Sequence, residues 1–211
     1  MVLKGQFLER PTLIPVGSAL VLEGLSHRGE KRPGLLVLSP PPVEGSGMDH
    51  VVSAELAFAA SHAGHPTLRF NYRGVGGSQG QPSRQVEALL DDALAALELA
   101  MENAGGEAVV VASLGASDAV AFKLASQVTL AGLALVSPSV LLPEDLAALP
   151  RLATAVVLAE ADPGQDRGRW ATALEAREGL LTVVPGATRA YQRNLPMVGK
   201  AVVGLLARLG A

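Results

Sequence analysis

From Gly34 onward the sequence alternates between short apolar segments and longer segments with helical periodicity. Short strands that are apolar throughout are typical of a parallel sheet whose two faces are covered by crossover helices. The alternation therefore predicts an α/β fold with a mostly parallel sheet. The strands are expected at 35–38, 66–72, 108–112, 133–137, 155–159 and 180–184, and the helices at 48–63, 85–103, 115–127, 143–149, 167–178 and 191–209.

Two further strands are predicted before this alternation, at 12–16 and 19–25, because β-forming residues flank Gly17-Ser18. They form an antiparallel pair, and a polar turn over 26–33 separates them from the rest. The sequence contains no internal repeat, low-complexity tract or linker, so we expect one domain over residues 1–211.

Composition excludes several kinds of partner. The net charge of −3, with dispersed basic residues and 3% aromatics, argues against nucleic acid, and the acidic pI argues against anionic membranes. The chain has no cysteine and no His, Asp or Glu pairs at ligand spacing, so neither a metal nor another cofactor is predicted. The first ten residues lack the apolar segment of a signal peptide, and no segment is long enough to span a bilayer, so we expect a cytoplasmic protein.

A serine follows the predicted strand 108–112. The loops beyond the carboxyl ends of parallel strands line one crevice, and Ser113 and Gly115 match the second half of the G-x-S-x-G nucleophile elbow. Val111 stands where the first glycine of that motif belongs. Ser113 is therefore a candidate nucleophile, and the alternative is a small residue that fits the turn and caps the following helix.

Residues 68–80 read LRFNYRGVGGSQG. This segment resembles the strand and loop of a group of small bacterial α/β hydrolases, dienelactone-hydrolase-like, whose hallmark is RFNFRGVGxSxG. Residues 38–52, with Pro40, Pro42 and Met48, match the same group. The likeness covers most of the chain and is strongest over 35–124. It implies an α/β-hydrolase fold without a lid domain and a site built on a serine, an acid and a histidine.

The resemblance also assigns the other members of that triad. Asp162, in AEAD, aligns with the acid of the group's GxxD, and Arg189, in PGATRAY, aligns with its catalytic histidine. Arginine has a pKa above about 12 and no acceptor, so Arg189 cannot take a proton from a serine. We therefore expect an incomplete triad in which Arg189 forms an ion pair with Asp162.

The expected oxyanion hole departs from the group as well. The group begins this loop His-Pro-His-Pro, whereas this chain has Ser39-Pro40-Pro41-Pro42. The resemblance implies backbone donors at Leu114 and near Pro40 and Pro41, but proline has no N–H to donate.

His50 is the one histidine predicted near the mouth of the crevice, where the group carries asparagine, so it is a candidate base or ligand. The other three histidines, His27, His62 and His65, are expected to face solvent, as are Asp91 and Asp92 on a helix. The glycines over 74–80 fit neither a dinucleotide nor a P-loop motif and predict a tight loop beside the crevice.

Two function hypotheses remain open. In the first, the protein is a catalytically silent pseudoenzyme that binds a small-molecule ester or a protein partner. In the second, it is a serine hydrolase of the esterase or thioesterase type, with Ser113 as nucleophile, Asp162 as the orienting acid and His50 or a substrate group as an unorthodox base. A homodimer is a further possibility.

Overall fold

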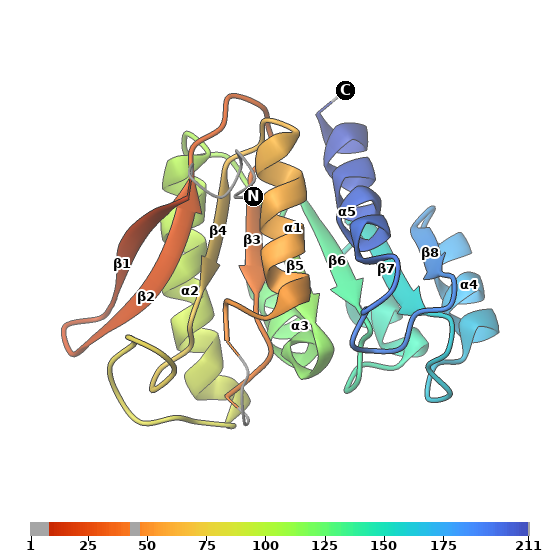
Figure 1. The fold of residues 1–211 in the computed structure, drawn as a ribbon, viewed down its shortest axis with the longest axis horizontal. Helices are drawn as coiled ribbons and strands as arrows, with labels where there is room; N and C mark the ends of the chain where they lie inside the picture. Colours follow the sequence, from red (N-terminus) through yellow and green to blue (C-terminus); the bar gives the residue numbers. More distant parts are fainter. Residues whose placement is uncertain (1–8, 43–46, 211) are drawn as a thin grey trace.

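The computed structural model describes residues 9–42 and 47–210, and within them eight strands form one sheet (Figure 1). The order across the sheet is β1-β2-β4-β3-β5-β6-β7-β8. β2 pairs antiparallel with both β1 and β4, and all other neighbours are parallel, which confirms the predicted mixed sheet. The strands are β1 (Arg10–Val16), β2 (Leu20–His27), β3 (Leu35–Leu38), β4 (Thr67–Phe70), β5 (Val110–Leu114), β6 (Gly132–Val136), β7 (Ala153–Ala159) and β8 (Leu180–Val184).

Helices cover both faces of this sheet. On one face α1 (Val51–His62) and α5 (Leu195–Leu209) lie side by side, in front of the strands in Figure 1. On the other face lie α2 (Val86–Asn103), α3 (Asp118–Gln127) and α4 (Arg167–Glu175). Two short 3₁₀ helices, η2 (Gly115–Ser117) and η3 (Pro143–Ala148), follow β5 and β6. Between β6 and β7, a segment that is described throughout, the chain forms only η3 and the loops that flank it, and no inserted domain.

The two faces of the sheet carry separate apolar cores. In β5, Val111 belongs to the core beneath α2, α3 and α4, whereas Val110, Ala112 and Leu114 belong to the core beneath α1 and α5. Successive side chains of a strand point to opposite faces. Ser113 therefore shares the face of Val111, toward α2 and α3.

Asp92 is wholly buried, so the prediction that it faces solvent is wrong. Its Oδ1 lies 2.7 Å from Nη2 of Arg73, and its Oδ2 accepts the backbone N–H of the same arginine at 2.9 Å. Consecutive helix residues are about 100° apart around the axis, so Asp92 points inward while its neighbour Asp91 is exposed. This ion pair fastens the loop that follows β4 to α2.

The glycine-rich loop after β4 is held by contacts with β2 and with Met48, just before α1. Asn71 accepts the N–H of Met48 at 2.7 Å and donates to Glu23 at 2.9 Å, and Glu23 also accepts the N–H of Gly77 at 2.7 Å. At Gly76, φ is +56° and a Cβ would lie 2.5 Å from Nδ2 of Asn71, so only glycine fits. Because the carboxylate of Glu23 already lies against this loop, the loop does not offer a binding site for phosphate.

Two further sequence expectations need correction. The last helix begins at Leu195, not near Tyr191, because Tyr191 and Asn194 adopt φ of +49° and +59°, which no helix continues. His65 is buried, not solvent-facing, because Nδ1 finds an acceptor in the carbonyl of Pro33 at 2.8 Å. No helix in the described part of the chain is both long and apolar enough to cross a membrane.

Candidate active site

Ser113 lies inside β5 and not at the turn that follows it. It pairs with Leu38 of β3 and Leu135 of β6, and the strand continues through Leu114. Its side chain is 1% exposed, and Oγ has no hydrogen-bond partner among the described residues. The prediction that the strand breaks before Ser113 is therefore wrong. The hydroxyl points into the core beneath α2 and α3 instead of the crevice at the end of the sheet.

The turn itself is made by Gly115. This residue follows β5 directly, has φ of +58°, and opens η2, which leads into α3. A Cβ built on it would meet no atom within 4 Å, so a side chain there would project into open space. A nucleophile elbow has this geometry: a strained strand-to-helix turn that exposes one side chain at the edge of the sheet.

The sequence Ser113-Leu114-Gly115-Ala116-Ser117 thus has the spacing of G-x-S-x-G with serine and glycine exchanged. Sequence reasoning missed this register because Ser113 and Gly115 also fit the second half of the motif. The apolar Leu114 was the available signal, since it extends the run of β-forming residues past Ser113.

The expected oxyanion-hole residues are buried or half-buried. Leu114 is the buried last residue of β5, and Pro40 and Pro41 are half-buried in the loop after β3. The hydroxyl of Ser117 donates to the carbonyl of Ser39 and so ties η2 to that loop. The carbonyl of Ser39 is therefore directed at the turn.

Asp162 and Arg189 form the expected ion pair. Nε of Arg189 lies 3.2 Å from Oδ2 of Asp162, although the two groups are not aligned as a hydrogen bond requires. Oδ1 of Asp162 accepts the N–H of Gly164 at 3.1 Å. Nη2 of Arg189 donates to the carbonyl of Ser137 at 3.3 Å. The carboxylate is almost fully buried and the guanidinium is half exposed.

These groups gather at one edge of the sheet. Gly115 follows β5, Ser137 follows β6 and Asp162 lies just beyond β7, and these three strands are adjacent. Neighbouring strands are about 4.8 Å apart, so Gly115 and Asp162 flank a gap about two strands wide. Arg189 reaches into this gap from the segment between β8 and α5.

Tyr191 holds the segment that carries Arg189, and sequence reasoning did not single it out. It is fully buried, its hydroxyl lies 2.8 Å from Oγ of Ser137, and the same hydroxyl donates to the carbonyl of Val157 at 3.2 Å. Burial raises the pKa of Tyr191 to about 12. The neutral phenol therefore fixes the arginine relative to β6 and β7.

Asp118 fixes the opposite wall and was also missed. It is fully buried at the start of α3, and its Oδ2 accepts the backbone N–H groups of Ser139, Val140 and Leu141 at 2.6–3.0 Å. The loop after β6 is thereby held against the start of α3, directly after η2.

His50 caps helix α1. Its Nδ1 accepts the N–H of Val52 at 3.2 Å, which occupies the lone pair that a base would need at that nitrogen. Burial lowers the pKa of His50, which favours the neutral ring that capping requires. In the described part of the chain no hydrogen bond joins His50 to Ser113, Gly115 or Asp162.

We expect this cap to make stability depend on pH. Because the pKa of His50 is lower in the folded state, its contribution is complete above the ordinary value of 6.5 and is lost as the pH falls through the folded pKa. Asparagine also caps helices but does not titrate. Between pH 7 and 5 the wild type should lose about 0.5 kcal/mol more than His50→Asn, measured by urea unfolding. Equal losses in the two proteins would show that His50 is not a titrating cap. His65, whose pKa burial also lowers, is common to both.

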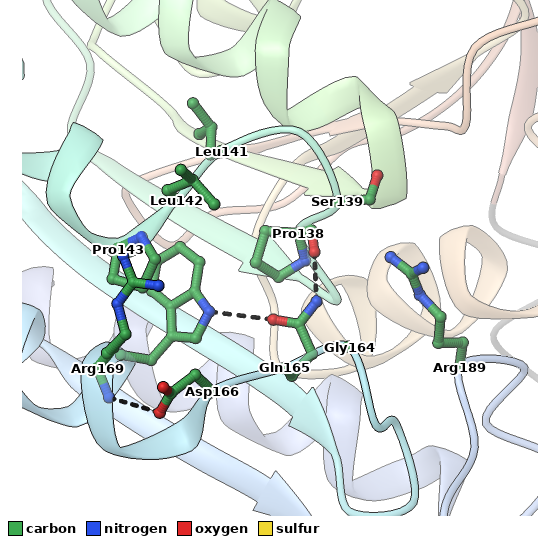
Figure 2. Close-up of a pocket in the computed structure, with 11 residues that line it drawn as sticks. Pro138, Ser139, Leu141, Leu142, Pro143, Gly164, Gln165, Asp166, Arg169 and Arg189 are labelled. Atoms are coloured by element: carbon green, nitrogen blue, oxygen red, sulfur yellow. Dashed lines mark hydrogen bonds between the residues drawn. The ribbon is translucent and has the colours of Figure 1, made fainter.

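A pocket of about 310 Å³ adjoins the Arg189 side of this edge (Figure 2). Its walls are the loop after β6, the loop between β7 and α4, and the start of α4. Nε2 of Gln165 donates to the carbonyl of Pro138 at 2.5 Å and so joins two of these walls. Among the described residues no group of three or more His, Asp or Glu side chains could hold a metal ion.

The sequence matches no protein-family model and no curated protein. Solved structures, in contrast, match over nearly the whole chain. An α/β serine hydrolase homologue from Coxiella burnetii is 23% identical, with a TM-score of 0.76 over 95% of this chain and 97% of its own. A lidless α/β serine hydrolase from Xanthomonas campestris is 21% identical, with a TM-score of 0.77 over 95% and 94%. Est1E from Butyrivibrio proteoclasticus, solved with ferulic acid bound, is 15% identical, with a TM-score of 0.76 over 94% and 98%.

These likenesses and the sheet topology define the class: the chain has the α/β hydrolase fold, with a mostly parallel eight-stranded sheet. Small bacterial α/β serine hydrolases, a lidless one among them, are its structural relatives. At these levels of identity the likeness establishes the fold alone.

Proposed function

We propose that this protein is a catalytically silent member of the α/β hydrolase fold that acts by binding a ligand. The observation that carries the proposal is Gly115. It has the left-handed φ and the open side-chain position of a nucleophile elbow, yet it has no side chain to attack a substrate. Without a nucleophile, no acyl-enzyme forms at this turn.

Arg189 supports the same proposal independently. A hydrolase of this kind needs a base between nucleophile and acid, and here a permanently charged guanidinium pairs with Asp162. The buried carboxylate is thereby committed to an ion pair. Both changes leave the fold intact and remove the proton-transfer chemistry.

A serine hydrolase that uses Ser113 is the alternative, and the structural relatives described as serine hydrolases favour it. It requires the Ser113 hydroxyl to reach a substrate and a base. That hydroxyl is buried on the α2 and α3 face of β5, and His50 is engaged as a helix cap. We therefore favour the silent protein.

Covalent labelling separates the two functions. We expect a fluorophosphonate probe to label the folded protein no more than it labels Ser113→Ala, because a buried hydroxyl without a base is a poor nucleophile. Mass spectrometry of the intact protein measures the adduct, and Ser139→Ala is a matched control at the crevice. Labelling that Ser113→Ala abolishes and Ser139→Ala leaves unchanged would overturn the proposal.

A further inference from the structure

We propose that the pocket beside Arg189 binds a small carboxylate with an apolar body, such as an arylalkanoate or a short-chain alkanoate. This inference rests on the proposed function, because a silent protein can hold such a molecule without turning it over. It names the ligand class of the binding site. Three features of the pocket support it: the N–H groups of Arg189 that remain free, the apolar walls, and the charges that face the pocket.

Arg189 offers a free guanidinium edge to the pocket. Two of its contacts are internal, Nε with Asp162 and Nη2 with the carbonyl of Ser137. A guanidinium has five N–H donors, so the two internal contacts leave donors over. The side chain is half exposed and lines the pocket, and Figure 2 shows the guanidinium directed toward Pro138 and Ser139. Its internal contacts fix the orientation in advance, which lowers the entropic cost of binding.

A planar guanidinium edge selects a carboxylate. Paired N–H donors match the two oxygens of a carboxylate, and such charge-assisted bonds are shorter and stronger than neutral ones. The other charged groups of the pocket are already used. Arg169 lies 2.6 Å from both oxygens of Glu144, and Asp166 caps α4 by accepting the N–H of Arg169 at 3.0 Å. Arg189 is therefore the cation available to a ligand.

The remaining walls suit the apolar part of such a molecule. Leu141, Leu142 and Trp170 line the pocket together with two prolines. Trp170 is almost fully buried behind this wall, and its indole N–H donates to Gln165 at 3.0 Å, so it adds no unpaired donor to the pocket. About 310 Å³ is the lower end of the range for small-molecule sites, which favours a compact ligand.

Trp170 provides the test, because it is the only tryptophan of the chain and it lines the pocket. Titration of the wild-type protein with 3-phenylpropanoate should change its fluorescence, with a dissociation constant on the order of 0.1–1 mM. The neutral 3-phenylpropanamide should bind roughly tenfold more weakly, because it loses the charge-assisted contact. Hexanoate and hexanamide, whose weak absorbance leaves the fluorescence undistorted, should show the same preference.

A pair of variants tests the role of Arg189. Arg189→Gln should remove the preference for the acid, whereas Arg193→Gln, an exposed position outside the pocket, should keep it. Equal affinity for acid and amide in the wild type, or no binding of either, overturns the carboxylate proposal without any variant. Fluorophosphonate labelling of the same preparation reports separately on catalytic silence, so the two proposals fail independently.

Discussion

The double variant Gly115→Ser/Arg189→His is expected to hydrolyse p-nitrophenyl acetate about 100-fold faster than Gly115→Ala/Arg189→His. The serine would place a hydroxyl in the open space at the elbow, and the histidine would supply a base beside the buried Asp162. Positioned general-base catalysis typically contributes a factor of this size or more. Initial rates at pH 8, corrected for hydrolysis without protein, measure the effect.

The alanine double variant is a matched control for this experiment. Both double variants place a non-glycine residue at φ of +58°, which costs about 1–2 kcal/mol in each, so the strain cancels. The two proteins differ by one hydroxyl. Equal rates would mean that Gly115 does not occupy the nucleophile position, and a rate lost on adding Ser113→Ala would assign that role to Ser113.

Asp92→Ala is expected to destabilise the protein by about 3–5 kcal/mol, because it leaves the partly buried Arg73 guanidinium and the Arg73 backbone N–H without their acceptor. Asp91→Ala, at the exposed neighbouring position of α2, should cost less than about 0.5 kcal/mol. Urea unfolding followed by circular dichroism gives both free energies of unfolding.

The contrast between neighbours is the informative quantity, since both substitutions remove one carboxylate and have the same effect on helix propensity. A loss below about 1 kcal/mol for Asp92→Ala would contradict the structural role given to the ion pair with Arg73. It would also mean that Asp92 does not anchor the loop after β4 to α2.

Most of the fold could be predicted because apolar periodicity is local. Every predicted strand and helix has a counterpart, and the antiparallel start and the parallel remainder are as expected. The ends of the elements could not be predicted as accurately, because they depend on strand partners. Leu114 continues β5 because it pairs with Val136 of β6, and that partner is distant in the sequence.

The candidate site was predicted in part. The sequence brought Asp162 and Arg189 together, through a resemblance in which each stands at a defined place, and the ion pair between them is present. It could not find Asp118 or Tyr191. Their importance comes from contacts with the loop after β6 and with β7, which only folding brings near.

By itself, the sequence determined the α/β architecture, the edge of the sheet where a site would lie, and, through the resemblance, the arginine that pairs with Asp162. The tertiary structure decided which residue occupies the turn. A shift of two residues in the end of β5 moves Ser113 from the crevice into the core and puts Gly115 in its place. Strand pairing and backbone dihedral angles fix that shift, and neither can be read from a motif in which serine and glycine alternate.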